Sequence, residues 1–185
     1  MDIISGTVDS LLGTYGQVAA YRHKVFVENL GWDLHAPDGL EQDQFDRPDT
    51  VYVVARDDEG KVCGCARLLP TTSPYLLSEV FPQLLNGAVP PNSPEIWELS
   101  RFAAVDFTSP NQSALRQMSS DIAINLLRAA IDCASKHGAK RLITVSPLGI
   151  ERLLRNAGFK AHRAGPPMRV DGHLIFASLI EVGEQ

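Results

Sequence analysis

Residues 51–69, VYVVARDDEGKVCGCARLL, predict a β-hairpin. Val51 to Ala55 and Val62 to Leu69 are apolar runs of strand length, so each is expected to form a strand. Asp57 to Gly60 lies between them and has the residue types of a tight turn. The two strands therefore form a hairpin, and its second strand contains a charged residue, Arg67.

Helical and strand-like segments alternate on both sides of this hairpin. Tyr15 to Asn29 has apolar residues at steps of three and four, which predicts an amphipathic helix. Ser113 to His137 has the same periodicity and ends at Gly138, a typical helix stop. The remaining expected elements are a short helical piece around Tyr75 to Leu85 and a helix that Pro147 can open and that runs through Glu151 to Asn156. Strands are expected at Ile96 to Ala104, Arg141 to Val145, Phe159 to Arg163 and Leu174 to Ile180.

This order of elements predicts one domain over residues 1–185 with an α/β fold. A helix, antiparallel strands, a long helix, a strand, a helix and two strands suit a three-layer α/β/α sandwich with a mixed, largely antiparallel sheet. A Rossmann fold is disfavoured because no G-x-G-x-x-G motif follows a strand. A length of 185 residues also suits a single domain.

The composition disfavours several classes of protein. No segment approaches the roughly 18 consecutive apolar residues of a membrane span, and acidic Asp2 and Asp9 stand where a signal peptide is basic. We therefore expect a cytoplasmic protein with no membrane partner. The formal net charge of −5 disfavours a nucleic-acid surface. The 5 histidines have no paired spacing, which predicts no metal site, and the 3 cysteines are expected to be buried thiols.

Charged side chains interrupt an otherwise apolar strand at Trp97-Glu98-Leu99-Ser100-Arg101-Phe102. An ionised group taken out of water costs several kcal/mol unless it is paired. Glu98 and Arg101 must therefore have partners. The connection from Leu30 to Pro48 carries many acids and is long for a small domain, which favours a functional role.

Five pieces of the chain, in order, resemble the LuxI-type acyl-homoserine-lactone synthases. They are Arg22 with Phe26, Leu30-Gly31-Trp32, the run from Glu41 to Asp46, Gly64 to Pro70, and Trp97 to Phe102. The resemblance covers nearly the whole chain and implies a fold similar to the GNAT N-acyltransferases. It also implies an enzyme that makes a quorum-sensing signal.

The reaction implied by the resemblance has two substrates and no cofactor. An acyl group passes from acyl carrier protein, or from acyl-CoA, to the amine of S-adenosylmethionine. A lactone then closes with release of methylthioadenosine. S-adenosylmethionine is a substrate here, and its charges suit a site with carboxylates, guanidinium groups and aromatic rings.

The resemblance also gives individual residues their roles. It implies that Glu98 is the general base for the substrate ammonium, with Ser100 and Arg101 in the catalytic group. The alternative is that Glu98 only pairs with Arg101 or Arg67. Strand alternation puts Ser100 on the face of Glu98 and Arg101 on the other face, unless a β-bulge turns it.

A second set of residues is expected to surround S-adenosylmethionine. Three arginines and three acids, Glu98 among them, would form a neutral network. Core packing is the alternative for the aromatic members, and a solvated loop is the alternative for the aspartates. The set is Arg22, Phe26, Trp32, Asp43, Asp46, Arg67 and Phe102, and the network adds Arg101 and Glu98.

The second half of the chain is expected to hold the acyl group and to bind its carrier. The Thr-x-Ser-Pro arrangement from Thr144 leaves a preference for 3-oxo chains open, and ordinary core packing is the alternative for the whole acyl set. Basic residues near the C-terminal half would steer an acidic carrier protein, with a solvated helix face as the alternative. The acyl set is Met118, Ile122, Leu142, Thr144, Ser146, Leu148, Leu153 and Phe176; the carrier set is Arg152, Arg155, Lys160 and Arg163, with Arg169 nearby.

Two other functions compete with this interpretation. An N-acetyltransferase that uses acetyl-CoA needs a glycine-rich phosphate loop after its strand, and Pro70-Thr71-Thr72-Ser73-Pro74 does not supply one. A non-catalytic sensor of an acyl or adenosyl ligand would not need all six charges. Acyl length, branching and oxidation do not follow from the sequence.

Overall fold

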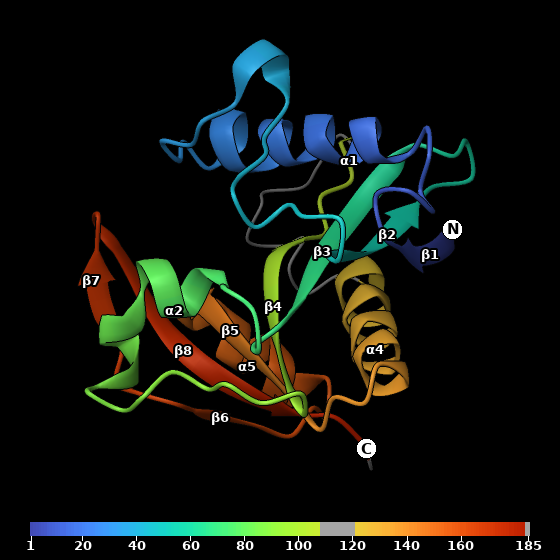
Figure 1. Ribbon diagram of the computed structural model, residues 1–185. Coiled ribbons are helices and arrows are strands. Elements are labelled where there is room, and N and C mark those ends of the chain that lie inside the picture. Colours follow the sequence, from blue (N-terminus) through green and yellow to red (C-terminus); the bar gives the residue numbers. More distant parts are fainter. Residues whose placement is uncertain (108–120, 184–185) are drawn as a thin grey trace. The chain divides into compact units, whose positions relative to one another are not determined.

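The computed structural model describes residues 1–107 and 121–183 (Figure 1). Its contacts group the chain into two compact units. The first unit is Met1–Arg67 with Arg101–Ala130, and the second is Leu68–Ser100 with Ile131–Gln185. The elements are β1 (Asp2–Gly6), α1 (Tyr15–Arg22), η1 (His23–Asn29), η2 (Pro37–Gly39), β2 (Val51–Arg56), β3 (Val62–Pro70), α2 (Leu76–Val80), η3 (Pro82–Leu85), β4 (Ile96–Ala103), α4 (Asp121–Lys136), β5 (Arg141–Pro147), α5 (Leu148–Asn156), β6 (Ala161–Arg163), β7 (Met168–Val170) and β8 (His173–Glu181).

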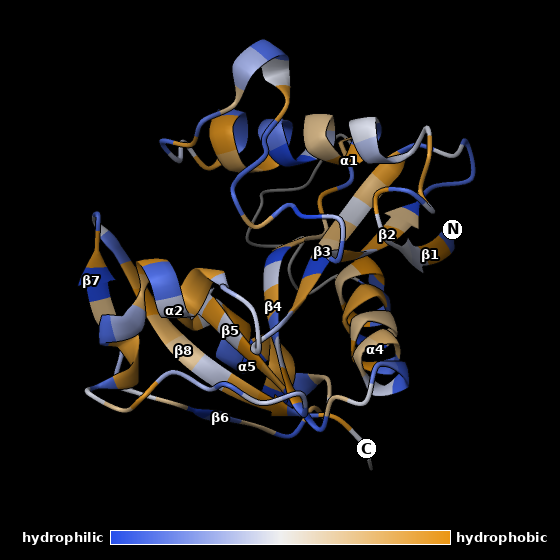
Figure 2. Ribbon diagram, in the orientation of Figure 1, coloured by the Kyte–Doolittle hydropathy of each residue, from blue (hydrophilic) through white to orange (hydrophobic). Residues whose placement is uncertain are grey.

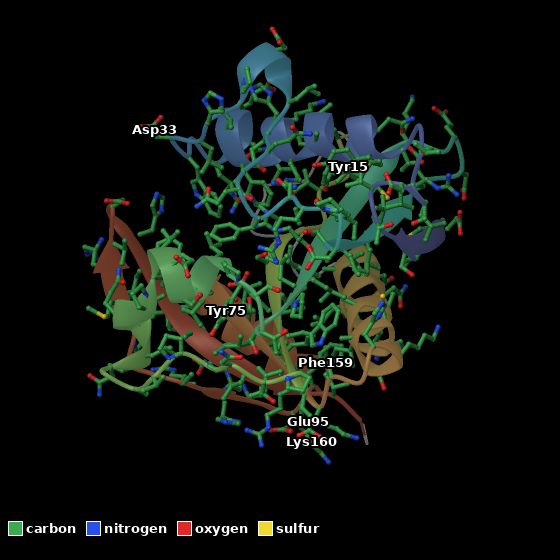
Figure 3. All side chains as sticks on the ribbon, in the orientation of Figure 1. Tyr15, Asp33, Tyr75, Glu95, Phe159 and Lys160 are labelled. Atoms are coloured by element: carbon green, nitrogen blue, oxygen red, sulfur yellow. The ribbon has the colours of Figure 1, made fainter. Side chains whose placement is uncertain are left out.

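The first unit packs helix α1 against the predicted hairpin of β2 and β3 (Figure 1). Strand β1, which the sequence did not predict, pairs antiparallel with β2 from Asp2 opposite Arg56 to Gly6 opposite Tyr52. The rings of Tyr15 and Tyr52 meet edge to face at 5.2 Å, and Figure 3 labels Tyr15 at this place. The core of the unit therefore forms between α1 and its strands, and it contains Val18, Tyr21, Val25, Phe26, Tyr52, Val54 and Cys65.

The predicted helix from Tyr15 to Asn29 is helical throughout, but it changes type at His23. Residues 23–29 form a π-helix, in which the backbone N–H of Leu30 donates to the carbonyl of Val25 at 3.0 Å. π-turns are rare and are often found at functional sites. Here the change of type follows directly on Arg22, which is buried, and the π-turns bury both Val25 and Phe26.

The second unit has a mixed sheet with strand order β4-β5-β8-β6, and β7 also pairs with β8. β4 and β5 are parallel, whereas β6, β7 and β5 each run antiparallel to β8. The register places Leu99 opposite Thr144 and Thr144 opposite Ser178, while Glu98 lies opposite Ile143. Directly paired residues share a face of a sheet and neighbours alternate, so Glu98 and Thr144 lie on opposite faces. We call these the Glu98 face and the Thr144 face.

Helices cover both faces of this sheet. The first residues of α2 bond to Glu98, which places α2 on the Glu98 face. Glu151 of α5 bonds to Arg163, which lies opposite Ser178, so α5 covers the Thr144 face. Figure 2 shows the apolar residues along α4, whose last turn is polar. Over the described ranges no helix combines the length and hydropathy needed to cross a membrane.

Candidate active site

Six charged side chains of the first unit form a closed ring in which acids and arginines alternate. Each arginine bridges two acids, and each acid bridges two arginines. Three positive and three negative charges make the set neutral, as a buried ionic network requires. In order around the ring they are Glu41, Arg22, Asp46, Arg67, Asp43 and Arg101, and we call this set the charge ring.

Arg22 makes the strongest contacts of the charge ring. Its Nη1 and Nη2 donate to the two carboxylate oxygens of Asp46 at 2.7 and 3.0 Å, a bidentate pair. Its Nε donates to Oε2 of Glu41 at 2.6 Å. Both Arg22 and Glu41 are only 1% exposed, so water cannot replace these bonds. The helix α1 and the loop that follows it are therefore tied together at this point.

Arg67 and Arg101 close the rest of the ring. Nη1 of Arg67 donates to Asp43 at 2.6 Å and to Asp46 at 3.2 Å. Nη2 of Arg101 donates to Glu41 and to Asp43, both at 3.0 Å. Asp43 has the most exposed side chain of the ring, at 15%. It is thus the ring carboxylate that a ligand can reach most easily.

The charge ring holds two of its acids, Glu41 and Asp46, in the ionised form. Burial by itself raises the pKa of Glu41, but hydrogen bonding to Arg22 and the charges of Arg101 and Arg22 outweigh burial, so this pKa is lowered. The pKa of Asp46 is lowered in the same way, by Arg22 and Arg67 against burial. Burial would lower the pKa of Arg22, yet Asp46 and Glu41 raise it. These three groups are therefore charged at neutral pH.

Local backbone geometry brings the ring members to their places. Arg101 has φ +50, a left-handed conformation that few residues other than glycine adopt. Strand alternation alone would place Arg101 on the face opposite Glu98 and Ser100. The left-handed backbone at Arg101 interrupts this alternation in β4. In the loop, Asp43 accepts a hydrogen bond from the N–H of Phe45 at 2.9 Å, and Asp46 accepts one from the N–H of Asp43 at 2.8 Å.

An aromatic pair lies next to the charge ring. The rings of Phe26 and Trp32 stack with their centroids 5.0 Å apart and 23° between their planes. The guanidinium of Arg101 lies 5.6 Å from the centre of the Phe26 ring, within cation–π range. Phe26 is buried, and Trp32, which packs against the core of the first unit, is partly exposed. Phe102, also in the predicted set, is partly buried in β4.

Glu98 has a different environment in the second unit. It is completely buried, and its carboxylate accepts hydrogen bonds from the backbone N–H groups of Leu76 at 3.1 Å and Leu77 at 2.7 Å. Both oxygens therefore have an N–H donor, which suits a carboxylate because it only accepts. Together with burial, the negative charge of Glu98 raises the pKa of Tyr75, which Figure 3 labels. Ser100 is also buried, two residues along the same strand.

Sequence reasoning did not include Glu41 in the site. The expected network took Glu98 as its third acid, whereas the charge ring closes with Glu41. The signal was present, because Glu41 begins the acidic run that also contains Asp43 and Asp46. Arg101 binds two acids of this loop, Glu41 and Asp43. The spacing of the acids in the sequence does not indicate which two of them Arg101 binds.

A family model described as "Autoinducer synthase" matches residues 13–185. The chain belongs to the autoinducer synthase family. The acyl-homoserine-lactone synthase of Acinetobacter nosocomialis is 59% identical over 183 residues, which are 98% of this chain and 100% of that protein. This autoinducer synthase is therefore an acyltransferase that makes an acyl-homoserine lactone.

Solved structures of similar proteins show the fold of this autoinducer synthase. TofI, in a ternary complex with an inhibitor and MTA, matches with a TM-score of 0.83 and 42% identity over 100% of this chain and 94% of its own. BjaI, a CoA-dependent synthase with SAM and isopentyl-CoA, matches with a TM-score of 0.86 and 28% identity over 99% and 84%. An acyl-CoA N-acyltransferase from Pseudomonas aeruginosa, at 0.60 and 15% identity over 97% and 98%, shares the fold alone. The expected GNAT-like α/β fold is confirmed.

The predicted acyl residues of this autoinducer synthase divide between the two units. Ile122 is partly buried on α4 in the first unit, and Met118 lies outside the described residues. In the second unit, the hydroxyls of Thr144 and Ser146 are 3.3 Å apart and both residues are buried. The other members in the second unit lie on the Thr144 face or on α5, and they are Leu142, Leu148, Leu153 and Phe176.

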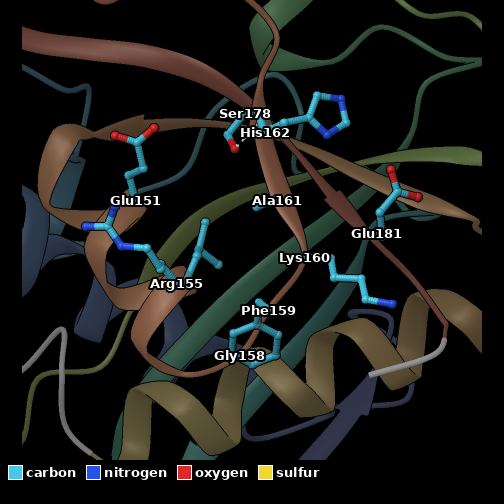
Figure 4. Close-up of a pocket in the computed structure, with 10 residues that line it drawn as sticks. Glu151, Arg155, Gly158, Phe159, Lys160, Ala161, His162, Ser178 and Glu181 are labelled. Carbon is cyan, nitrogen blue, oxygen red and sulfur yellow. Dashed lines mark hydrogen bonds between the residues drawn. The ribbon is translucent and has the colours of Figure 1, made fainter.

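The predicted carrier residues of this synthase do not share one environment. Arg155 and Lys160 line an open cavity of about 590 Å³ between α5, β6 and β8 (Figure 4). Arg152 is exposed on α5. Arg163 is bound to Glu151 through two hydrogen bonds of 2.7 Å. Arg163 is thus the member of the set whose charge is already paired.

Proposed function

We propose a role for each of the two units of this synthase, taken by itself. The first unit binds S-adenosylmethionine with the charge ring and the aromatic pair Phe26 and Trp32. The second unit supplies the general base, Glu98, and holds the acyl group. The observation that carries the proposal is the charge ring, a neutral and buried set of six charges beside an aromatic pair.

The chemistry of S-adenosylmethionine suits the accessible part of the charge ring. The substrate carries an ammonium and a sulfonium, and a carboxylate and an aromatic face are the groups that bind such cations. Asp43, as the most exposed acid of the ring, is the proposed partner of the ammonium. Trp32 is the proposed partner of the sulfonium or the adenine. Arg22, Asp46 and Arg67 act as positioning residues, because their charged groups are bound to one another.

The proposed base, Glu98, has to remove one proton from the substrate ammonium. A free α-amine has a pKa of about 8, so little energy is needed to remove its proton near neutral pH. Glu98 takes this proton, and the amine lone pair attacks the thioester carbonyl. The carbon–sulfur bond of the thioester breaks, the thiol leaves with a proton, and an amide forms. The carboxylate of the methionine part then attacks the γ-carbon of the same part, and the bond from this carbon to the sulfonium sulfur breaks. The lactone closes, and the sulfur leaves with its electron pair as methylthioadenosine.

No acyl-enzyme intermediate is part of this proposal. Burial raises the pKa of Cys65 to about 12 and that of Cys63 to about 11, so neither is a thiolate at neutral pH. Ser100 is not proposed as a nucleophile, because direct attack by the amine needs no acyl-enzyme. Buried thiols also suit a reducing compartment, which supports the expected cytoplasmic location.

The acyl chain is proposed to lie on the Thr144 face. The register of β4 with β5 runs from Ile96 to Leu99 on β4, whereas β5 stays paired with β8 as far as Pro147. Beyond Thr144 the two strands no longer share this register, and we place at this point the proposed crossing of the acyl chain from the Glu98 face to the Thr144 face. The apolar side chains under α5, with Thr144 and Ser146, would then surround it.

We propose acyl carrier protein as the donor, because exposed Arg152, Arg155 and Lys160 can attract an acidic partner. The test incubates the pure protein with S-adenosylmethionine and either octanoyl-carrier protein or octanoyl-CoA. Mass spectrometry then follows methylthioadenosine and octanoyl-homoserine lactone. We expect equal amounts of both products and a higher kcat/KM with the carrier protein. Equal or faster turnover with the CoA thioester would overturn the choice of donor.

A further inference from the structure

Phe176 lies under an ion pair at the outer strand of the second unit. It is completely buried, and the guanidinium of Arg163 lies 5.5 Å from the centre of its ring. The same guanidinium donates two hydrogen bonds of 2.7 Å to the two carboxylate oxygens of Glu151. Glu151 belongs to α5 and Arg163 to β6. The pair therefore links the helix to the strand above the Phe176 ring.

The sheet register connects this ion pair to the proposed acyl site. Thr144 lies opposite Ser178, and Ser178 lies opposite Arg163. These three residues form a row across the Thr144 face, from the middle of the sheet to its outer strand. Phe176 is two residues from Ser178 on β8 and opposite Ser146, so it shares that face. Phe176 is thus placed beside Thr144 and Ser146, toward the strand that carries Arg163.

The cavity shown in Figure 4 borders the same row. Ser178 and Glu151 line it, together with the apolar side chains of Leu154 and Phe159. Figure 4 shows Ser178 beside His162, whose carbonyl accepts a hydrogen bond from the Ser178 hydroxyl at 3.2 Å. A volume of about 590 Å³ is that of a small-ligand pocket. None of the seven described acyl residues lines it.

We propose that Phe176 is the end wall of the acyl site, held in place by Arg163 and Glu151, and that it keeps longer acyl chains out of the cavity beside α5. Arg163 and Glu151 are positioning residues, since they act through the Phe176 ring. The proposal rests on the proposed function, because it takes the acyl chain to lie on the Thr144 face. It also gives Arg163 a different role from carrier docking.

The test measures the chain-length profile of variants of the full-length enzyme. Acyl carrier protein is loaded with hexanoyl, octanoyl, decanoyl, dodecanoyl and tetradecanoyl chains, and kcat/KM is measured for each. The ratio of long-chain to short-chain kcat/KM is the readout. Every donor has the same carrier, so a change in docking affects all chain lengths equally and leaves the ratio unchanged.

We expect the ratio to rise roughly tenfold or more in Phe176→Ala, because each methylene accommodated in an apolar pocket is worth at least about this factor. Phe176→Leu gives a smaller rise and keeps more of the core. Arg163→Gln raises the ratio a few-fold by releasing the ring, roughly as Glu151→Gln does, whereas Arg163→Lys keeps the cation over the ring and gives a smaller change.

Two matched control variants distinguish a loss of the proposed end wall from a general loss of an ion pair or of core packing in the second unit. Arg141→Gln removes a cation from another ion pair of the same unit, with Glu181 at 3.8 Å, and should leave the ratio unchanged. Ile143→Ala removes a fully buried side chain from the opposite face of β5 and should lower activity for all chains equally. Cooperative thermal unfolding shows that each variant is folded.

A further variant, Thr144→Phe, tests the end wall separately from the proposed position of the acyl chain on the Thr144 face. Thr144→Phe places a ring on the Thr144 face itself, and we expect it to reject long chains. An unchanged profile in folded Thr144→Phe would show that the acyl chain does not lie on this face. A changed profile in Thr144→Phe, with unchanged ratios in both Phe176 variants and in Arg163→Gln, would overturn the end wall alone.

Discussion

The charge ring and the Thr144 face solve the problem of buried polar groups in opposite ways. The ring buries six full charges, and every acid is bound by two arginines. The buried polar groups of the Thr144 face are uncharged hydroxyls, at Thr144, Ser146 and Ser178, and its ion pair of Arg163 with Glu151 lies at the outer strand. A closed ionic network fixes one geometry, whereas an apolar face tolerates changes of size. The difference suits one invariant substrate, S-adenosylmethionine, and one variable substrate, the acyl chain.

The largest expected effect tests Glu98, the proposed base, which belongs to neither region. Glu98→Gln keeps the shape of the side chain and removes its ability to accept a proton, so kcat should fall by roughly 10²- to 10⁴-fold. The variant should still unfold cooperatively and bind S-adenosylmethionine in calorimetry, but its amide NH2 faces one of the two backbone N–H donors, which should cost about 1–3 kcal/mol of stability. Glu95→Gln, on the exposed residue three positions earlier, is the control. Full activity in Glu98→Gln would give Glu98 a purely structural role.

The next largest effect is expected on the free energy of unfolding, when a substitution removes one acid of the charge ring. Asp46→Ala leaves Arg22 and Arg67 without one of their acids, and removing one partner of a buried pair costs about 3–5 kcal/mol. Urea unfolding should show a loss of this size in the free energy of unfolding. Asp49→Ala, which removes an exposed acid of the same loop that pairs with Arg47, should cost less than about 1 kcal/mol. Similar losses in the two variants would mean that the ring contributes no more than a surface pair.

A third experiment compares the two regions by their response to acid. Glu41 and Asp46 have pKa values lowered in the folded state, so the stability they contribute is complete above their ordinary values, 4.5 and 3.8, and is lost as the pH falls below them. Trp32 lies in the first unit and Trp97 in the second. The chain has 2 tryptophans, so Trp97→Phe leaves only Trp32 and Trp32→Phe leaves only Trp97. The acid transition seen by fluorescence should begin at a higher pH in the variant that keeps Trp32. A first transition at Trp97 would contradict this order.

The smallest expected effect concerns the Thr144 face. Thr144→Val keeps the shape and removes one hydroxyl of a pair 3.3 Å apart, so the free energy of unfolding should change by about 1 kcal/mol or less. The KM for S-adenosylmethionine should not change, whereas the preference among acyl chains with and without an oxygen at the third carbon should shift. A changed KM for S-adenosylmethionine would show that the two regions are not functionally separate.

The sequence predicted the fold well where local patterns are strong. The hairpin of β2 and β3, the helix α1 and the strands β4, β5 and β8 follow from apolar runs and periodicity. Strand β1 was missed because its five residues are short and half exposed. The π-turn after Arg22 was missed because its apolar positions fit an ordinary helix equally well.

The site was predictable in its residue types but not in its connections. Arg22, Arg67 and Arg101 were expected to meet loop acids, and they do. The place of Glu41 in the ring depends on the left-handed backbone at Arg101, which no local pattern indicates. The binding of Arg163 to Glu151 depends on the pairing of β6 with β8, a contact between distant parts of the chain.

The alternation of signs in the charge ring also determines how its field extends into solvent. Equal and opposite charges that follow one another around a closed path largely cancel at a distance, so the ring acts on a ligand only at close range. S-adenosylmethionine should therefore bind at a rate that depends little on ionic strength. The proposed partner, acyl carrier protein, is expected to be attracted by the exposed cations Arg152, Arg155 and Lys160, so its binding should become slower as salt is added.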